Sequence, residues 1–252
     1  MSLFYLFYKE SGIQRLFRRN ASVPAGSYDA RVMPRLARVV VPGYPHHVTQ
    51  RGSRRQRTFF SETDYRVYLA LMNETCRRSG VEIWAYCLMP NHVHLVAVPP
   101  SADALRSAIG NAHRRYTHRI NKRNGWRGFL WQGRFTSFVM DERYLRAAVR
   151  YTELNPVRAG IVGEAADYRW SSARAHLEGR DDGLVKAAPM LERIADWNAF
   201  LGDASQPLPA STLHQHEARG HPLGSEGFVA EMEGLLGRAL RPNPRGRPRK
   251  VV

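Results

Sequence analysis

The pattern of apolar and polar residues predicts a strand followed by a helix in the first part of the chain. After a Pro-Gly turn signal, the β-branched and apolar run at 46–51 predicts a strand, which a glycine and a basic loop end. Ser61 and Asp64 have the spacing of a helix-start capping box. The residues at helical spacing that should form the buried face are Tyr65, Tyr68, Leu69, Met72 and Cys76. We expect this helix to end at Gly80.

Two apolar runs separated by a Pro-Asn turn signal predict a β-hairpin over residues 86–98. Successive side chains of a strand point to opposite faces, so His92 and His94 should share one face, about 6.6 Å apart along the strand, with Val93 in the core. Two imidazoles at that spacing can converge on one cation, and we expect both at a surface. The alternative is a polar strand face with two solvated histidines.

The rest of the pattern predicts a second helix over 102–121, a strand over 136–140 and a third helix capped by Asp141. The apolar side of the second helix holds Leu105, Ile109, Ala112, Tyr116 and Ile120, and its polar residues, His113 among them, lie elsewhere. The third helix should stop at Asn155, because Pro156 disfavours helical geometry in the residue before it. The order β-α-β-β-α-β-α indicates the α+β class: a ferredoxin-like split βαβ arrangement with an antiparallel sheet, helices on one face and an added helix.

Changes of composition divide the chain into four predicted parts. Residues 1–32 are expected to be a disordered tail, 33–175 the main folded domain, 176–240 a helical appendage and 241–252 a basic tail. The basic tail resembles an AT-hook, which can enter an A·T-rich minor groove, through Arg245, Arg247 and Arg249. A non-specific phosphate-binding tail is an equal alternative.

The charge balance points to a polyanionic partner. The chain has 38 Lys+Arg against 22 Asp+Glu, a formal net charge of +16, so nucleic acid is the leading candidate. No apolar run is long enough to span a bilayer, and we expect no membrane partner. Cys76 and Cys87 are the only cysteines and form no Cys-x-x-Cys, which argues against a zinc ribbon or a disulfide framework. We expect a cytoplasmic, nucleoid-associated protein.

Three motifs follow one another along the chain. They are Tyr-x-Leu-Met-Pro-Asn-His-Val-His at 86–94, Trp-Gln-x-Arg-Phe at 131–135 and Tyr-Thr-Glu-Leu-Asn-Pro-Val-Arg-Ala-Gly at 151–160. Together they resemble the REP-associated tyrosine transposases, which are single-strand insertion-sequence transposases of the HUH class. The resemblance covers roughly 33–175 and agrees with the predicted fold. It implies a small endonuclease that cuts and rejoins single-stranded DNA through one tyrosine, usually at hairpin-forming repeats.

The resemblance also implies roles for four residues. His92 and His94 match the family's metal-binding pair, Tyr151 the nucleophile, and Asn155 a third, helix-borne metal ligand. Residues i and i+4 of a helix are neighbours, so one helical face could offer both Tyr151 and Asn155 to the metal. A free phenol has a pKa of about 10 and is a weak nucleophile at neutral pH, so Mg²⁺ or Mn²⁺ would be needed to polarise the scissile phosphate. The alternative for Tyr151 is a core aromatic beside Tyr144.

We therefore expect a DNA transposase or single-strand endonuclease that works through a covalent phosphotyrosine intermediate with a divalent metal, on single-stranded or hairpin DNA. The competing hypothesis is a catalytically silent hairpin-DNA-binding protein, a domesticated relative. The family contains monomers and tyrosine-swapping dimers, so monomer and homodimer both stay open.

Other DNA contacts are predicted from basic and aromatic residues. Stacking on unpaired bases with phosphate contacts could come from Trp126, Phe129, Trp131 and Phe135 with Arg127 and Arg134. Packing of these rings under the sheet is equally compatible with the sequence. Contacts to a duplex stem could come from Arg54, Arg55 and Arg57 in the first loop and from Arg114, Arg115 and Arg119 on the second helix. A solvated charged face is the ordinary alternative for each arginine.

Overall fold

A computed structural model describes residues 38–203, 216 and 220–241 of the chain. The predicted tail at 1–32 and the AT-hook-like residues Arg245, Arg247 and Arg249 lie outside the described residues. Within the described part, no helix combines the length and the apolar character that crossing a membrane requires.

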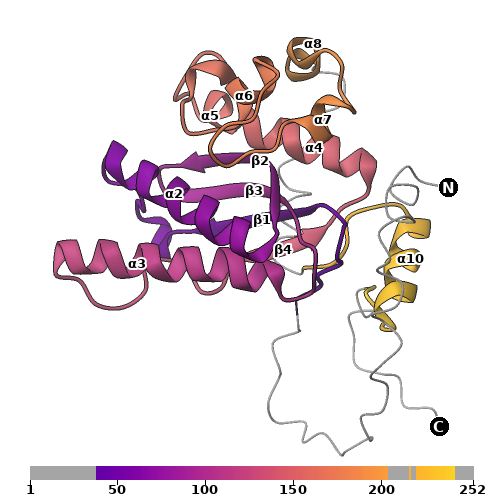
Figure 1. Cartoon of the computed structure of the whole chain (residues 1–252), viewed down its shortest axis with the longest axis horizontal. Helices are drawn as coiled ribbons and strands as arrows, with labels where there is room; N and C mark the ends of the chain where they lie inside the picture. The colour runs from indigo at the N-terminus through magenta and orange to yellow at the C-terminus, as the bar shows by residue number, and fades with distance from the viewer. Residues whose placement is uncertain (1–37, 204–215, 217–219, 242–252) are drawn as a thin grey trace, which may run out of the picture. The chain divides into compact units, whose positions relative to one another are not determined.

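A four-stranded antiparallel sheet forms the centre of the fold (Figure 1). Its strands are β1 (His46–Arg51), β2 (Glu82–Met89), β3 (His92–Val98) and β4 (Thr136–Val139), in the order β2-β3-β1-β4. Helix α2 (Glu62–Ser79) joins β1 to β2, which have β3 between them, and α3 (Asn111–Asn124) joins β3 to β4, which have β1 between them. The predicted α+β class with an antiparallel sheet is confirmed.

Helix α2 begins and ends where local signals place it. Ser61 and Asp64 form the predicted capping box, and Gly80 ends the helix with a φ of 64°, a left-handed conformation that favours glycine. Asp64 is fully buried and accepts hydrogen bonds from Arg123 near the end of α3. Burial opposes ionisation of this carboxyl, but the Arg123 guanidinium and two backbone amides hold its pKa below the ordinary value. The pair therefore joins the two helices.

Helix α3 extends a short π-helical segment, η3 (Arg106–Gly110), and buries the predicted apolar residues. The prediction that His113 lies away from the buried side of the helix is wrong. It lies inside the core, where the hydroxyl of Tyr68 is 2.8 Å from its Nε2 atom. Burial lowers the pKa of His113 to about 3, so it is neutral in the folded protein at physiological pH. A histidine that shares a hydrogen bond behaves here as an aromatic core residue.

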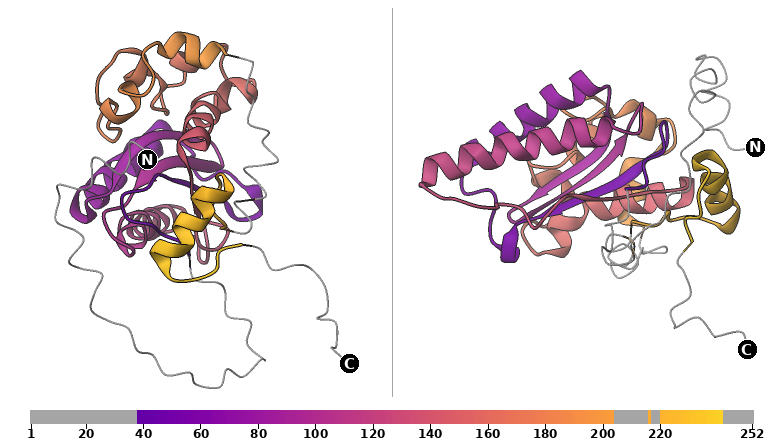
Figure 2. Two further views of the ribbon diagram at one scale, coloured as in Figure 1. Left: turned by 90° about the vertical axis from the view of Figure 1, so that its right-hand side faces the viewer. Right: turned by 90° about the horizontal axis from the view of Figure 1, so that it is seen from below.

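Helix α4 (Glu142–Glu153) covers the other face of the sheet (Figure 2). Val93 and Leu95 pack with residues of α2 and α3, whereas the ring of His94, on the alternate face of β3, lies against Tyr151 of α4. The prediction of helices on one face therefore holds for α2 and α3 only. Asp141 caps α4 as predicted, accepting a hydrogen bond from the amide of Tyr144.

The chain beyond α4 first runs along the outer edge of β2. The helices of this part are α5 (Asn155–Arg158), η4 (Ala165–Asp167), α6 (Ala173–Leu177), α7 (Ala188–Leu191) and α8 (Trp197–Gly202). The last helix, α10 (Glu226–Leu236), instead packs with Val39, Val41 and Val139, the last residue of β4. Backbone amides of Leu88 and Lys186 donate to the carbonyls of Trp170 and Ile83, each at 2.8 Å. These bonds use polar groups that an edge strand would otherwise expose.

Candidate active site

The two histidines of the hairpin share one face of β3, as predicted. Their ring centroids are 4.9 Å apart, and Val93 between them is fully buried on the opposite face. His92 is half-buried, but His94 is only 2% exposed. The expectation that both would lie at the surface is wrong for His94, because α4 and strand β1 cover it.

A third histidine, His47 on β1, lies next to this pair. The antiparallel register sets Thr49 opposite His94, so His47 lies two residues along β1 on the same face of the sheet. Its Nε2 atom is 3.3 Å from Nδ1 of His94, and the two rings stack at 5.3 Å with an interplanar angle of 21°. From the sequence alone His47 is recognisable only as part of a strand, because its place beside His94 depends on a register that local patterns do not specify.

Asn91, in the turn before β3, connects His92 to the arginine-containing loop at 51–57. Its Nδ2 atom donates to the carbonyl of Arg55 at 3.0 Å, and its Oδ1 atom is 2.6 Å from Nδ1 of His92. Two residues of the loop, Arg54 and Arg55, have φ values of 54° and 60°, which are uncommon for side chains other than glycine. Such conformations persist when surrounding contacts hold them, and they cluster at functional sites.

Gly52 makes the close packing of this loop possible. A Cβ atom at this position would lie 2.2 Å from the carbonyl oxygen of Gln56 and 3.3 Å from that of Asn91. Both neighbours are backbone atoms, so a side chain at residue 52 would push the loop away from the hairpin turn.

Tyr151 is brought to the histidines by α4. Its ring meets that of His94 edge-to-face at 5.5 Å, and it is 7% exposed. The guanidinium of Arg158 on α5 lies 5.1 Å from the Tyr151 ring centroid. Arg158 was not among the predicted site residues, although it belongs to the motif that contains Tyr151. The neighbouring tyrosine of the same helix, Tyr144, has the guanidinium of Arg143 over its ring, at 5.9 Å.

Asn155 does not lie on the same helix as Tyr151. Helix α4 ends at Glu153, and Asn155 begins the short helix α5. One continuous helical face therefore does not carry both residues, because the helix is interrupted at Leu154 and a new one starts at Asn155. Asn155 is half-buried, and its Nδ2 atom is buried without a hydrogen-bond partner among the described residues. In that part of the chain, no cluster of three or more His, Cys, Asp or Glu side chains forms a metal site.

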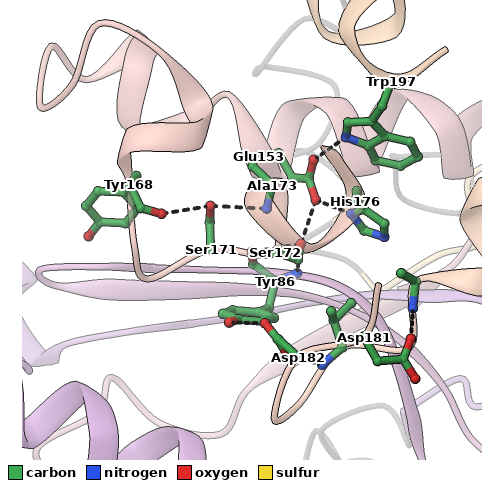
Figure 3. A network of polar contacts seen from close by, with 12 residues as sticks. Tyr86, Glu153, Tyr168, Ser171, Ser172, Ala173, His176, Asp181, Asp182 and Trp197 are labelled. Carbon is green, nitrogen blue, oxygen red and sulfur yellow. Dashed lines mark hydrogen bonds and ion pairs between the residues drawn. The ribbon is translucent and has the colours of Figure 1, made fainter. Parts of the chain in front are cut away.

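A buried polar network fastens the end of α4 (Figure 3). Glu153 is fully buried and accepts hydrogen bonds from Ser172 Oγ at 2.6 Å, His176 Nδ1 at 2.6 Å and Trp197 Nε1 at 2.9 Å. The partners come from the chain before α6, from α6 and from α8. Local sequence patterns do not reveal this network, since the partners lie 19 to 44 residues from Glu153 along the chain.

The predicted DNA-contacting arginines within the described residues are exposed, whereas the predicted aromatic residues differ in exposure. The exposed arginines are Arg54, Arg55, Arg57, Arg114, Arg115, Arg119, Arg127 and Arg134. Helix α3, with Arg114, Arg115 and Arg119, covers the face of the sheet opposite His94, and Arg115 pairs with Glu74 at 2.9 Å. For Trp131 the packing alternative holds and base stacking does not, because it is 6% exposed and lies in the core beside Phe59, Tyr68 and His113.

Two other aromatic residues of the predicted set do reach solvent. Trp126 is 46% exposed and Phe129 is 88% exposed, whereas Phe135 is buried. Trp126 also contacts Phe60, itself 39% exposed, with ring centroids 5.5 Å apart. The guanidinium of Arg123 lies 5.8 Å from the Phe60 ring centroid. We call Phe60, Trp126 and Phe129 the exposed aromatic group.

Comparison with known proteins agrees with this geometry. Residues 41–155, which include the three histidines, Tyr151 and Asn155, match the family described as "Transposase IS200 like". An Escherichia coli K12 REP-associated tyrosine transposase is 24% identical over 120 residues, covering 47% of this chain and 70% of that protein. A Haemophilus influenzae protein assigned to the same group is 26% identical over 122 residues, covering 44% and 69%.

The fold is also similar to a solved structure. A solved REP-associated tyrosine transposase bound to a REP hairpin superposes with a TM-score of 0.50 at 23% identity, covering 60% of this chain and 90% of that one. The likeness supports the fold, and with the two sequence relatives it confirms the resemblance to REP-associated tyrosine transposases.

Proposed function

We propose that this protein cleaves and rejoins single-stranded DNA at hairpin-forming repeats, with Tyr151 as the nucleophile. The observation that carries the proposal is the contact between the Tyr151 ring and His94, beside His92. A tyrosine and two imidazoles from distant segments meet on one face of the sheet, in a segment that matches a transposase family. Both Tyr151 and His94 belong to the same chain, so a second copy is not required to bring them together.

The reaction exchanges one phosphodiester for another. The Tyr151 hydroxyl loses its proton and attacks the phosphorus, the bond from phosphorus to the 3′ oxygen breaks, and that oxygen leaves as a hydroxyl after taking up a proton. The 5′ phosphate is then bound to Tyr151. Attack by a DNA 3′ hydroxyl on this phosphotyrosine reverses the step, so the strand can be rejoined without ATP.

The donor set fits a hard divalent cation, Mg²⁺ or Mn²⁺. His92 and His94 supply two imidazoles with ring centroids 4.9 Å apart, and the side chain of Asn155 would supply an amide oxygen. Amide and phosphate oxygens suit Mg²⁺ and Mn²⁺. When bound, the cation would polarise the scissile phosphate and offset the charge that develops there. His92, His94 and Asn155 would hold it.

The arginine loop and the exposed aromatic group are the proposed DNA-contacting surface near the site. Arg54, Arg55 and Arg57 are exposed on the loop that Asn91 fastens beside His92. Leu130, next to Phe129, accepts a hydrogen bond from the amide of Ser53, so the two segments are adjacent. Guanidinium groups hold phosphates, and exposed rings stack on unpaired bases. The hairpin-bound structural relative supports DNA hairpins as the partner class.

The decisive experiment replaces Tyr151 with phenylalanine. The ring remains and only the hydroxyl is lost, so binding of a palindromic single strand should stay within about twofold of wild type while cleavage and the detergent-resistant covalent protein–DNA band disappear. Tyr144→Phe on the same helix is the matched control and should keep the band. If Tyr144→Phe loses the band and Tyr151→Phe keeps it, the nucleophile is misassigned. If wild-type protein yields no band with Mg²⁺ or Mn²⁺, the silent hairpin-binding hypothesis is favoured.

A further inference from the structure

Both candidate ligand histidines have their Nδ1 atoms engaged by other side chains of the protein. Nδ1 of His92 is 2.6 Å from Oδ1 of Asn91, and Nδ1 of His94 is 3.3 Å from Nε2 of His47. A neutral imidazole has one nitrogen that carries a proton and one that carries a lone pair. The group that hydrogen-bonds to Nδ1 therefore determines whether Nε2 has the lone pair needed to bind a cation.

For His92, the hydrogen-bond directions are set by Asn91. The Arg55 carbonyl can only accept, so the amide group 3.0 Å from it must be the nitrogen of Asn91, and the amide oxygen faces His92. An amide oxygen can only accept, so Nδ1 of His92 must be the donor. His92 is thus held as the Nδ1–H tautomer, which leaves the lone pair on Nε2.

For His94, the partner is itself a histidine, and one proton lies between two ring nitrogens. If His47 donated it, the neutral His94 ring would carry its own proton on Nε2 and could not bind a cation there. If His94 donates it, the lone pair of His94 lies on Nε2 and His47 serves as acceptor. Stacking on His94 and contact with Phe138, at a ring distance of 5.3 Å, hold the fully buried His47 ring in place for that role.

We propose that Asn91 and His47 are positioning residues that hold His92 and His94 as Nδ1–H tautomers, with the lone pair of each ring on Nε2, the form in which an imidazole can bind a cation through that atom. The cation itself rests on the proposed function, whereas the tautomers are properties of the protein alone. Asn91 has a second task, because the carbonyl it binds belongs to Arg55, in the left-handed pair of the arginine loop. One side chain thus orients a ligand and fastens the loop proposed to contact DNA.

Nitrogen NMR of the metal-free protein tests the tautomers directly. With ¹⁵N-labelled histidine at pH 8, where imidazoles are mostly neutral, His92 and His94 should show protonated Nδ1 and unprotonated Nε2. Asn91→Ala should move His92 toward a mixture of tautomers and leave His94 unchanged. His47→Phe keeps a stacked ring but no nitrogen. It should move His94 toward a mixture of tautomers and leave His92 unchanged. A merely structural role would lower stability without moving either tautomer.

Metal affinity supplies the second readout. Loss of an outer hydrogen bond to a ligating histidine weakens metal binding by roughly 10- to 100-fold, so Mn²⁺ titration followed by electron paramagnetic resonance should show this loss for Asn91→Ala and His47→Phe. Asn121→Ala is the matched control: its amide also donates to a backbone carbonyl, of Gly128 at 2.9 Å. It should bind Mn²⁺ as wild type does.

Asn91→Asp separates the two tasks of Asn91. A carboxylate can still accept from Nδ1 of His92 but cannot donate to Arg55, so the His92 tautomer should persist while hairpin-DNA affinity falls several-fold. An Nε2–H tautomer of His92 in wild type, or unchanged tautomer and Mn²⁺ affinity in Asn91→Ala, would overturn the inference for Asn91. An Nε2–H tautomer of His94 in wild type, or unchanged tautomer and Mn²⁺ affinity in His47→Phe, would overturn the inference for His47. If the tautomers respond as expected but wild type binds no Mn²⁺, the positioning stands and the metal role in the proposed function fails.

Discussion

Each candidate ligand histidine has its Nδ1 atom against another side chain of the protein, and in the proposed site Nε2 would bind the cation, so removing both rings should remove the metal. In the double variant His92→Ala/His94→Ala, we expect no Mn²⁺-dependent cleavage and near-normal hairpin binding. The buried ring of His94 leaves a cavity, which should lower the unfolding free energy by about 2 kcal/mol. Cleavage and urea unfolding, measured below the melting temperature of the variant, separate the two effects. Cleavage at the wild-type rate would refute the assignment of the metal ligands. His118→Ala, at an exposed position on α3, is the control.

At this scale, local rules predicted what local chemistry decides. The shared face of His92 and His94 follows from strand alternation, and the Ser61 cap from helix-start spacing. The contacts of His47 and Asn91 could not be predicted, because they depend on strand register and on a loop that returns to the turn. The burial of Trp131 could not be predicted for a related reason: an aromatic between arginines has the same local pattern whether it faces solvent or the core.

Among the elements, α4 depends on a buried carboxylate at its end. The three groups around Glu153 all donate hydrogen bonds to it. In Glu153→Gln, an amide NH₂ would face at least one of these donors, so a buried donor loses its acceptor and the unfolding free energy should fall by about 1–3 kcal/mol. Because Tyr151 is two residues away, cleavage should slow while hairpin affinity stays unchanged.

The control for Glu153 lies at the opposite end of the same helix. Glu142 pairs with Arg146 and Arg193 at 3.4 and 3.3 Å in a partly exposed setting, so Glu142→Gln should change stability by no more than about 1 kcal/mol. Urea unfolding and single-turnover cleavage of both variants check the comparison. Equal effects of the two substitutions would argue against a special role for the Glu153 network.

The arrangement of elements was predictable as far as their order determined it. Four strands and the helices α2 and α3 follow from periodicity, caps and turns, and the antiparallel sheet follows from their sequence along the chain. The place of α4 on the second face, the break before Asn155 and the chain along β2 depend on packing between distant segments. Such contacts leave little trace in the periodicity of either partner.

For the whole molecule, buried histidines make stability depend on pH. Burial lowers the pKa of His46 to about 4 and of His113 to about 3, below the unfolded value of about 6.5. On acidification the unfolded chain binds protons first, so the unfolding free energy begins to fall as the pH drops below about 6.5. It continues to fall until the pH reaches the folded-state pKa values. Each histidine contributes a slope of up to about 1.4 kcal/mol per pH unit in that window.

His113→Gln should flatten this dependence, because glutamine can still hydrogen-bond to the Tyr68 hydroxyl but does not titrate. Urea unfolding between pH 7.5 and pH 4.5 would then show a slope smaller than that of wild type by up to about 1.4 kcal/mol per pH unit at the acidic end. The exposed His118, on the same helix, is the control, and His118→Gln should leave the slope unchanged. A variant that lowers stability equally at every pH would mean that His113 contributes packing alone and that its buried neutral state does not couple folding to protons.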